Sequence, residues 1–381
     1  MTIKFRPCLF IIFAFLTTYS LNSCKKEAIP LKDSEIGSSA NSQRQATAEV
    51  VVSSGSSIQA AVNAAASNTT IRIQPGTYNE AIVVNKSGIK LIGEEGPNGQ
   101  TVIIQNPGDE EDGIRVLDAG DGFVLKNVTI QNFEENGVFL VRVNGFTLSH
   151  VTTINNGEYG LFPVRCSNGT IEHCSATGHT DTGIYVGQST DVILEFNTVF
   201  ANVIGLEIEN CSDIIVRKNH CYDNVCGILS VLLPGLTVKT SSGILIEQNQ
   251  VNNNNHVNFA EPGGGFEAFV PSGSGILIVG TDNTIVKDNK VRDNNFTGIA
   301  TVSTLILGAI AGIPPAAFAD IEPNPDGNKI IGNDLLHNGT LPPVGLPLPG
   351  NDLLWDGSGS NNCWSQNSFT ISIPSALPVC N

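Results

Sequence analysis

A glycine followed by alternating apolar residues recurs along the middle of the chain at an almost constant step. The steps are 24, 23, 23, 22 and 22 residues, between Gly113, Gly137, Gly160, Gly183, Gly205 and Gly227. A second column of short apolar runs keeps the same step, at Leu125, Leu148, Ile171, Leu194 and Val216. Two short strands per period cannot bury their apolar faces alone, but they do so when coil stacks on coil. The repeat therefore predicts an all-β fold, a single-stranded right-handed parallel β-helix with 22–24 residues per coil.

The repeat continues toward the C-terminus with Gly275 and Gly298. The gap of 48 residues between Gly227 and Gly275 indicates two periods enlarged by loops. Asparagines recur after the second strand, where they predict a ladder of side-chain hydrogen bonds along the stack; they are Asn197, Asn219, Asn249 and Asn289. A leucine-rich repeat has a similar period, but its Leu-x-x-Leu-x-Leu consensus is absent.

The two ends of the chain carry different signals. Lys4 and Arg6, an apolar run and then Leu-Asn-Ser-Cys24 predict a signal peptide over residues 1–23. Leu-x-Ser-Cys resembles the lipobox of bacterial lipoproteins, which implies acylation of Cys24 and a flexible tether over 24–50; ordinary cleavage near Ser23 is the alternative. We therefore expect an exported, membrane-anchored lipoprotein of the bacterial cell envelope, on the outer membrane, with the β-helix over 51–381.

Ser57 precedes Ile58, Ala61, Val62 and Ala65 at helical spacing, which predicts a short N-terminal capping helix. At the other end, Cys363 and Cys380 flank a short segment of an exported chain, and we expect a disulfide between them. The five mid-chain cysteines fall on repeat positions, where a small buried thiol is expected rather than metal or redox chemistry.

A formal charge of −16 makes nucleic acid an unsuitable partner and would suit a basic protein. It also opposes a polyanionic ligand unless Ca²⁺ or local arginines offset it. No cysteine or histidine spacing typical of a zinc site is present.

Three stretches resemble known β-helix families. Residues 57–93, with Ser-Ile-Gln-Ala-Ala-Val and Pro-Gly-Thr-Tyr, look like the entry to pectin-lyase-like proteins. Asp181-Thr-Gly-Ile-Tyr-Val-Gly-Gln-Ser and Gly205-Leu-Glu-Ile-Glu-Asn resemble a family of exported right-handed parallel β-helix repeat proteins. This resemblance covers nearly all of the mature chain, and it identifies a fold rather than a reaction.

Residues 159–164 read Tyr-Gly-Leu-Phe-Pro-Val and resemble the catalytic strand of mannuronan C5-epimerases, Tyr-Gly-Phe-Asp-Pro-His. The tyrosine, glycine and proline are kept. The Asp and His that do acid–base work in that family are replaced by Phe162 and Val164. The resemblance therefore does not carry the same mechanism to this chain.

The strand pattern predicts an outward-facing file next to the glycine column, at about 4.8 Å per coil. It consists of Arg115, Phe139, Phe162, Tyr185, Glu207 and Leu229. Glu209 lies two residues after Glu207, and the following turn supplies Arg142, Arg165, Gln188 and Asn210. With Tyr159, His179 and Asp181 nearby, these residues form the predicted site, in which Phe139 and Phe162 offer flat faces for a sugar ring.

We expect this site to bind a polysaccharide and to modify it as a lyase or epimerase acting on uronate. In that hypothesis Arg165 stabilises the enolate-like intermediate, Tyr185 transfers the C5 proton, and Glu207 and Glu209 hold Ca²⁺; otherwise no cofactor is needed. Glu207 and Glu209 also suit a hydrolase with paired carboxylates. Two non-catalytic alternatives are a merely solvated face and an envelope lipoprotein that binds a protein partner.

Four insertions rich in proline and glycine interrupt the later repeats, over 231–242, 254–274, 302–327 and 339–362. A solenoid collects its insertions at turns, where loops of successive coils build one wall of a groove. Shielding of the C-terminal end of the stack is the alternative role.

Overall fold

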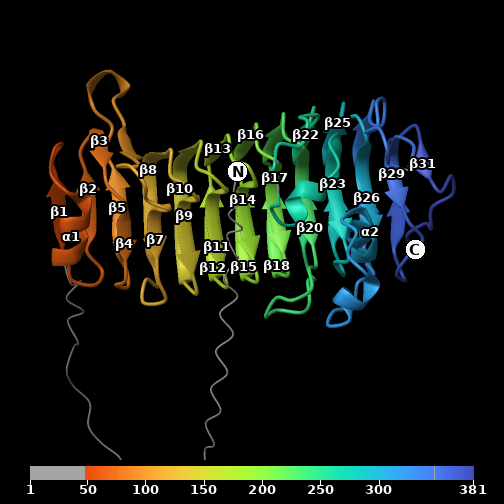
Figure 1. Cartoon of the computed structure of the whole chain (residues 1–381), viewed down its shortest axis with the longest axis horizontal. Helices are drawn as coiled ribbons and strands as arrows, with labels where there is room; N and C mark the ends of the chain where they lie inside the picture. Colours follow the sequence, from red (N-terminus) through yellow and green to blue (C-terminus); the bar gives the residue numbers. More distant parts are fainter. Residues whose placement is uncertain (1–47, 262, 347) are drawn as a thin grey trace, which may run out of the picture. The chain divides into compact units, whose positions relative to one another are not determined.

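A computed structural model describes residues 48–261, 263–346 and 348–381. The predicted signal peptide, Cys24 and nearly all of the tether lie outside this range. Within it, no helix has both the length and the apolar character needed to cross a membrane. The described residues form a parallel β-helix, whose strands follow one another from β1 to β31 along the stack (Figure 1).

One face of the β-helix is a parallel sheet of eleven strands, here called the front sheet. Its strands are β4 (Ile82–Val84), β7 (Asp112–Val116), β9 (Asn136–Val141), β11 (Tyr159–Val164), β14 (Thr182–Gly187), β17 (Ile204–Glu209), β20 (Cys226–Val231), β23 (Ser274–Val279), β26 (Thr297–Val302), β29 (Asn351–Trp355) and β31 (Ser372–Ile373). Apart from the terminal β31, each strand begins near a glycine of the repeat or its equivalent, so the front sheet is the glycine column of the sequence.

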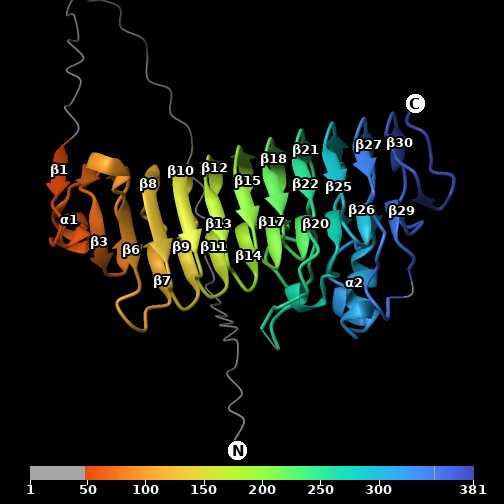
Figure 2. The same cartoon turned by 90° about the horizontal axis from the view of Figure 1, so that it is seen from above.

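The remaining twenty strands form two further ladders on the other side of the core (Figure 2). The first contains β1 (Glu49–Val52), β2 (Thr70–Ile73), β5 (Lys90–Gly93), β8 (Phe123–Gln131), β10 (Asn144–Ile154), β12 (Ser167–Glu172), β15 (Thr190–Glu195), β18 (Ser212–Arg217), β21 (Leu245–Glu247), β24 (Ile285–Lys287), β27 (Lys329–Ile331) and β30 (Cys363–Ser365). The second contains β3 (Gly76–Asn79), β6 (Val102–Gln105), β13 (Ser175–Thr177), β16 (Thr198–Phe200), β19 (His220–Tyr222), β22 (Gln250–Asn252), β25 (Lys290–Arg292) and β28 (Asp334–Leu336). The long strands β8 and β10 belong to both.

A typical coil therefore has three strands, whereas the sequence predicted two. The third is only three residues long, as in β13 and β16, and it follows a sharp corner. His173 and Phe196 stand at that corner with φ of 53° and 57°, in the left-handed region. This local reversal divides one apolar run into two strands, and neither residue is one of the usual glycine or asparagine turn signals.

The strand register confirms both predicted columns. Leu125 is paired with Leu148, and Ile171 with Leu194. The outward-facing file of the front sheet is also confirmed, because Phe139 pairs with Phe162 and with Arg115, and Glu207 pairs with Tyr185 and Leu229.

The prediction of two periods between Gly227 and Gly275 was wrong. Ile228 pairs directly with Ile276, so β20 and β23 are neighbours and one coil spans the gap. Two insertions, before β21 and after β22, supply the additional length. Residue counts alone do not distinguish a second coil from two loops in one coil.

The buried asparagine side chains at the corners form hydrogen bonds with one another along the stack, in place of the hydrogen bonds to water that they lose on burial. In the predicted ladder, the amide nitrogen of Asn197 donates to Asn219, and Asn219 donates to Asn249, each at 3.0 Å. The same pattern continues through Asn289 to Asn333, which confirms the ladder. A second asparagine ladder stands at the corner before the front sheet; it consists of Asn202, Asn224, Asn254, Asn294 and Asn338.

At the N-terminal end, the helix α1 (Ile58–Ala64) begins after Ser57, whose hydroxyl accepts from the backbone of Ala60, and it buries Ile58 and Val62. At the C-terminal end, Cys363 and Cys380 form the expected disulfide. The five mid-chain cysteines are free and buried, as the repeat predicted.

The insertions pack on the outer surface of the front sheet and at its margin. The helix α2 (Thr304–Ile310) and the turns η2 (Phe266–Phe269) and η3 (Pro315–Phe318) belong to them, whereas η1 (Pro97–Gly99) lies near the N-terminal end. Leu229 and Leu277, from the front sheet, form a second apolar cluster with Val270 and Leu307 from these insertions. The C-terminal half of the front sheet is therefore covered, and its N-terminal half is left with polar and aromatic side chains.

Candidate functional site

Aromatic rings follow one another along the N-terminal half of the front sheet, and we call Phe139, Phe162, Tyr159 and Tyr185 the aromatic row; its last member, Tyr185, is buried. Phe139 stacks on Phe162 with ring centres 5.2 Å apart, and Tyr159 stacks on Phe162 at 4.2 Å. Tyr185 meets Phe162 edge to face at 4.8 Å. The Arg115 guanidinium lies 5.9 Å from the centre of the Phe139 ring. The row thus extends over three successive coils.

The aromatic row ends at three carboxyl groups, Asp181, Glu207 and Glu209, which we call the carboxylate cluster. The Tyr185 hydroxyl donates to Glu209 at 2.6 Å. The Thr182 hydroxyl lies 2.9 Å from Asp181 and 2.7 Å from Glu207. Asp181 is 8% exposed and Glu207 is 6% exposed, so these two carboxyl groups are buried, whereas Glu209 is half-buried.

Burial is the main cause of the unusual protonation of this cluster. It raises the pKa of Asp181 to about 8, with a further contribution from the charge of Glu267. Burial also raises the pKa of Glu209 to about 7, although the hydrogen bond from Tyr185 opposes the shift. The pKa of Glu207 is raised well above its usual value by burial and by the charges of Asp181 and Glu209. Protons are therefore held on this cluster at neutral pH.

The geometry around Thr182 supports the same conclusion independently. A hydroxyl group carries one proton and donates one hydrogen bond. Thr182 contacts a carboxyl oxygen of both Asp181 and Glu207, and it can donate to only one of them. The other contact is favourable when that carboxyl group is itself protonated and donates to the threonine oxygen.

An insertion contributes a fourth acidic group that the sequence did not suggest. Glu267, in η2, is half-buried, and its charge raises the pKa values of Asp181 and Glu209. Its position depends on how the 254–274 insertion folds back, and no repeat signal encodes that path. Thr182 was also missed, although it stands directly before the glycine of its coil.

The predicted residues of the turn after each front strand lie away from the carboxylate cluster. Arg142, Arg165, Gln188 and Asn210 all have positive φ, between 49° and 55°. Arg142 pairs with Asp118, and Arg165 donates to Thr237 in the first insertion at 2.6 Å. Gln188 accepts from the backbone of Thr237, and Asn210 bonds to the backbone of Leu233. Three of these four therefore hold the insertion in place, and Arg165 bonds to that insertion rather than to Tyr185 or Glu207.

His179 also lies apart from the predicted site. Its ring is fully buried at the corner where the neighbouring coils carry Asn156 and Asn202. The two ring nitrogens are bonded to the Thr153 hydroxyl and to the carbonyl of Asn156. Burial lowers the pKa of His179 to about 4, so it is a neutral member of the corner ladder.

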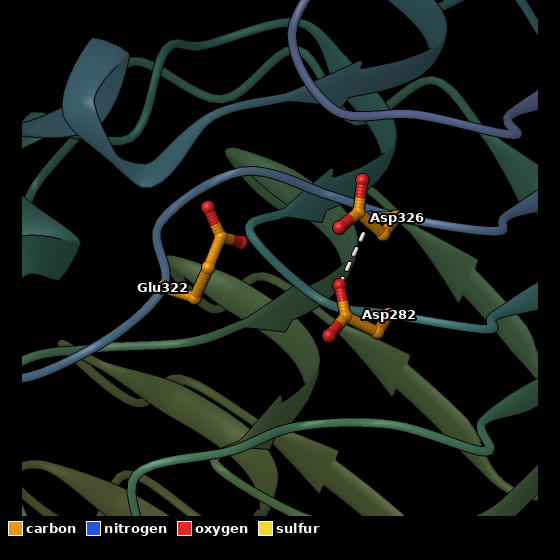
Figure 3. Close-up of side chains that lie close together, drawn as sticks. All are labelled: Asp282, Glu322 and Asp326. Carbon is orange, nitrogen blue, oxygen red and sulfur yellow. Dashed lines mark hydrogen bonds between the residues drawn. The ribbon is translucent and has the colours of Figure 1, made fainter.

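A Ca²⁺ site formed by Glu207 and Glu209 stays a prediction. Within the described part of the chain, one group of three acidic residues places ligand atoms within 4.8 Å of one another: Asp282, Glu322 and Asp326 (Figure 3). Asp282 accepts from the backbone of Asp326 at 2.9 Å, and Ser360 donates to Asp326. These contacts explain the arrangement as the anchoring of an insertion.

Residues 112–232 match the family model for the right handed beta helix region. No curated protein matches the chain in sequence. Together with the register, this match makes the chain a right-handed parallel β-helix protein by fold.

Several solved structures have the same fold. The A-module of mannuronan C-5 epimerase AlgE4 from Azotobacter vinelandii is 17% identical, with a TM-score of 0.56 over 85% of this chain and 95% of that one. The AlgE6 A-module is 14% identical, with a TM-score of 0.57 over 82% and 90%. DFA-IIIase from Arthrobacter chlorophenolicus A6 in complex with GF2 is 13% identical, with a TM-score of 0.54 over 82% and 79%. At these identities the likeness shows the shared fold.

Proposed function

We propose that this protein binds a polysaccharide along the aromatic row and acts on it by acid–base chemistry at the carboxylate cluster. The observation that carries the proposal is the direct contact between the two: Tyr185 touches Phe162 with its ring and Glu209 with its hydroxyl. Aromatic faces bind sugar rings, and buried carboxyl groups with shifted pKa values are typical of catalytic sites. The epimerase modules of similar fold support a carbohydrate ligand.

Hydrolysis of a glycosidic bond fits this cluster best. Glu207, whose pKa is raised well above its usual value by burial and by the charge of Asp181, is suited to donate a proton to the leaving oxygen, and Asp181 is its partner. Both contact the Thr182 hydroxyl, so their carboxyl groups lie close together, as the paired carboxyl groups of retaining glycosidases do. Glu209, with a pKa of about 7, exchanges protons readily at neutral pH.

Elimination or epimerisation of a uronate is the second candidate, favoured by the fold shared with the epimerase modules and by two tyrosines beside the cluster. Its difficulty is electrostatic. Burial and the neighbouring glutamates raise the pKa of Tyr185, so this phenol keeps its proton, and Arg165 contacts Thr237 instead of the cluster. A uronate would need a bound cation to offset the carboxylates.

The test is product analysis after incubation with neutral, amino-sugar and uronate polysaccharides, recording new reducing ends and the ultraviolet absorbance of unsaturated ends. Glu207→Gln is expected to lower the rate by about 10²–10⁴-fold, the usual loss when a general acid is removed. Glu172→Gln is the matched control, since Glu172 ends β12 on the opposite side of the core. New reducing ends without ultraviolet absorbance identify a hydrolase. Ultraviolet absorbance from unsaturated ends identifies a lyase. Activity that survives Glu207→Gln would exclude this residue as the acid.

Binding is tested separately with Phe162→Ala. Loss of the ring removes the centre of the aromatic row and is expected to weaken glycan binding about tenfold or more, as for other stacked aromatic contacts. Phe200→Ala is the control, because Phe200 stacks on Tyr222 at a distance of 5.1 Å between ring centres, on β16 and β19, away from the front sheet. If no glycan binds and a basic protein is captured in stoichiometric amount, the non-catalytic envelope protein is the correct function.

A further inference from the structure

A file of acidic side chains runs parallel to the aromatic row, one residue per coil, and we call it the acidic file. It consists of Glu111, Glu135, Glu158 and Asp181. The backbone nitrogen of Glu135 donates to the carbonyl of Glu111, Glu158 donates to Glu135, and Asp181 donates to Glu158. Successive members are therefore about 4.8 Å apart along the stack, the spacing of adjacent strands.

The charge of Arg115 acts on the middle of the acidic file, although no ion pair forms there among the described residues. Within the described residues, neither Glu135 nor Glu158 forms an ion pair, whereas Glu111 contacts Arg115. Burial and neighbouring acids raise the pKa values of both Glu135 and Glu158. Stacking like charges at this spacing is unfavourable, and nothing in the repeat requires it, because serine or asparagine would fill the same turn.

Asn136 provides an independent sign that a donor belongs beside the acidic file. Its side chain lies on the front sheet between Asp112 and Tyr159, and it is 5% exposed. The amide nitrogen donates to Asp112 at 2.6 Å, which fixes the orientation of the amide. The amide oxygen is then a buried acceptor without a donor among the described residues. Such an atom is costly unless a ligand or a water molecule supplies the missing hydrogen bond.

Resting on the proposed function, we infer that the polysaccharide bound on this face is an amino-sugar polymer that carries one ammonium group per sugar. The aromatic row would stack the rings, and the carboxylates of Glu135 and Glu158 would receive ammonium groups from the edge of the chain that faces them. An ammonium group has three donors and no acceptor, which matches a surface that offers several carboxylates.

The charges near the acidic file disfavour two other classes of polymer, polyuronates and neutral polysaccharides. Arg115 is engaged with Asp112 and Glu111, and Arg142 with Asp118. A polyuronate would therefore meet repelling charges without a free cation beside the row. A neutral polymer would stack on the rings but leave the carboxylates of Glu135 and Glu158 without partners.

The test is calorimetric titration of the whole protein, in the presence of EDTA, with hexamers of β-linked glucosamine, N-acetylglucosamine and mannuronate. Glucosamine hexamer is expected to bind at least about tenfold more tightly than the other two, and to lose that preference as salt rises because the contacts are ionic. Glu135→Gln combined with Glu158→Gln should weaken glucosamine binding about tenfold. The matched control is Glu172→Gln combined with Asp191→Asn, which removes the same charge from the opposite side of the core.

The outcomes separate this inference from the proposed function. If the acetylated or the mannuronate hexamer binds as tightly as glucosamine, or if the double glutamine variant binds glucosamine unchanged, the amino-sugar assignment is wrong, although carbohydrate binding stands. If none of the hexamers binds and no polysaccharide in the panel is bound or altered, the proposed function fails with it.

Discussion

Between pH 4 and pH 8 the protein is expected to lose stability as the pH rises, opposite to the usual behaviour of paired surface carboxylates. Asp181 has a pKa near 8 and Glu209 near 7 in the folded state, against 3.8 and 4.5 for exposed groups. The folded state therefore holds more protons than the unfolded state in this window. Stability is fully present below about pH 4 and is lost as the pH passes through the folded pKa values.

The expected loss is several kcal/mol, since each pKa unit corresponds to about 1.4 kcal/mol and two groups contribute. It is measured as the shift in urea midpoint between pH 5 and pH 8 at constant ionic strength. Asp181→Asn combined with Glu209→Gln should reduce this shift strongly, because both replacements keep the shape and cannot ionise. The control variant combines Asp191→Asn with Glu172→Gln, on the opposite side of the core. It should show the same shift in urea midpoint between pH 5 and pH 8 as the unmodified protein. An unchanged pH profile in the first variant would show that the carboxylate cluster is not the source.

The expected loss of stability at neutral pH connects the fold with the proposed function. A buried cluster of acidic residues destabilises the folded state at neutral pH. Packing alone gives no reason for acidic side chains at these positions. Glu207 stands in the same file as Leu229, whose apolar side chain shows what this position accepts when it is merely covered. Strained or destabilising groups at such positions are typical of functional sites.

Much of the fold could be predicted from the sequence because a β-helix is built from local, periodic rules. The glycine step placed Phe139 beside Phe162 and Tyr185 beside Glu207, and the register agrees. Side chains one period apart lie on the same face whatever the coil contains between them, so spacing alone was sufficient.

The site was less predictable because it depends on features outside the period. Burial of Glu207 and the approach of Glu267 result from insertions whose path has no sequence rule. Arg165 was expected beside Tyr185, but its positive φ turns the side chain toward Thr237. Apart from Asp181, the members of the acidic file were missed because they stand in turns, where a single acid is ordinarily just solvated.

Asn224→Ala is expected to destabilise the protein by about 3 kcal/mol or more, without change in the aromatic row. Asn224 is fully buried in the second ladder, where its amide nitrogen donates to Asn254 at 2.9 Å and its oxygen accepts from Asn202 at 3.1 Å. The same amide also bonds the backbone carbonyls of Val199 and Tyr222. Alanine would leave these partners buried and unpaired, which costs about 1–3 kcal/mol for each group that finds no water.

Asn252→Ala is the matched control for this ladder. Asn252 ends β22, is half-buried, and forms a side-chain hydrogen bond with His220. Its loss is expected to cost less than about 1 kcal/mol, as for other partly exposed polar groups. Urea midpoints of the two variants are compared at pH 5, where the carboxylate cluster is protonated in the folded state. Equal midpoints would mean that water replaces the ladder amide, and that packing of the apolar columns alone keeps the coils in register.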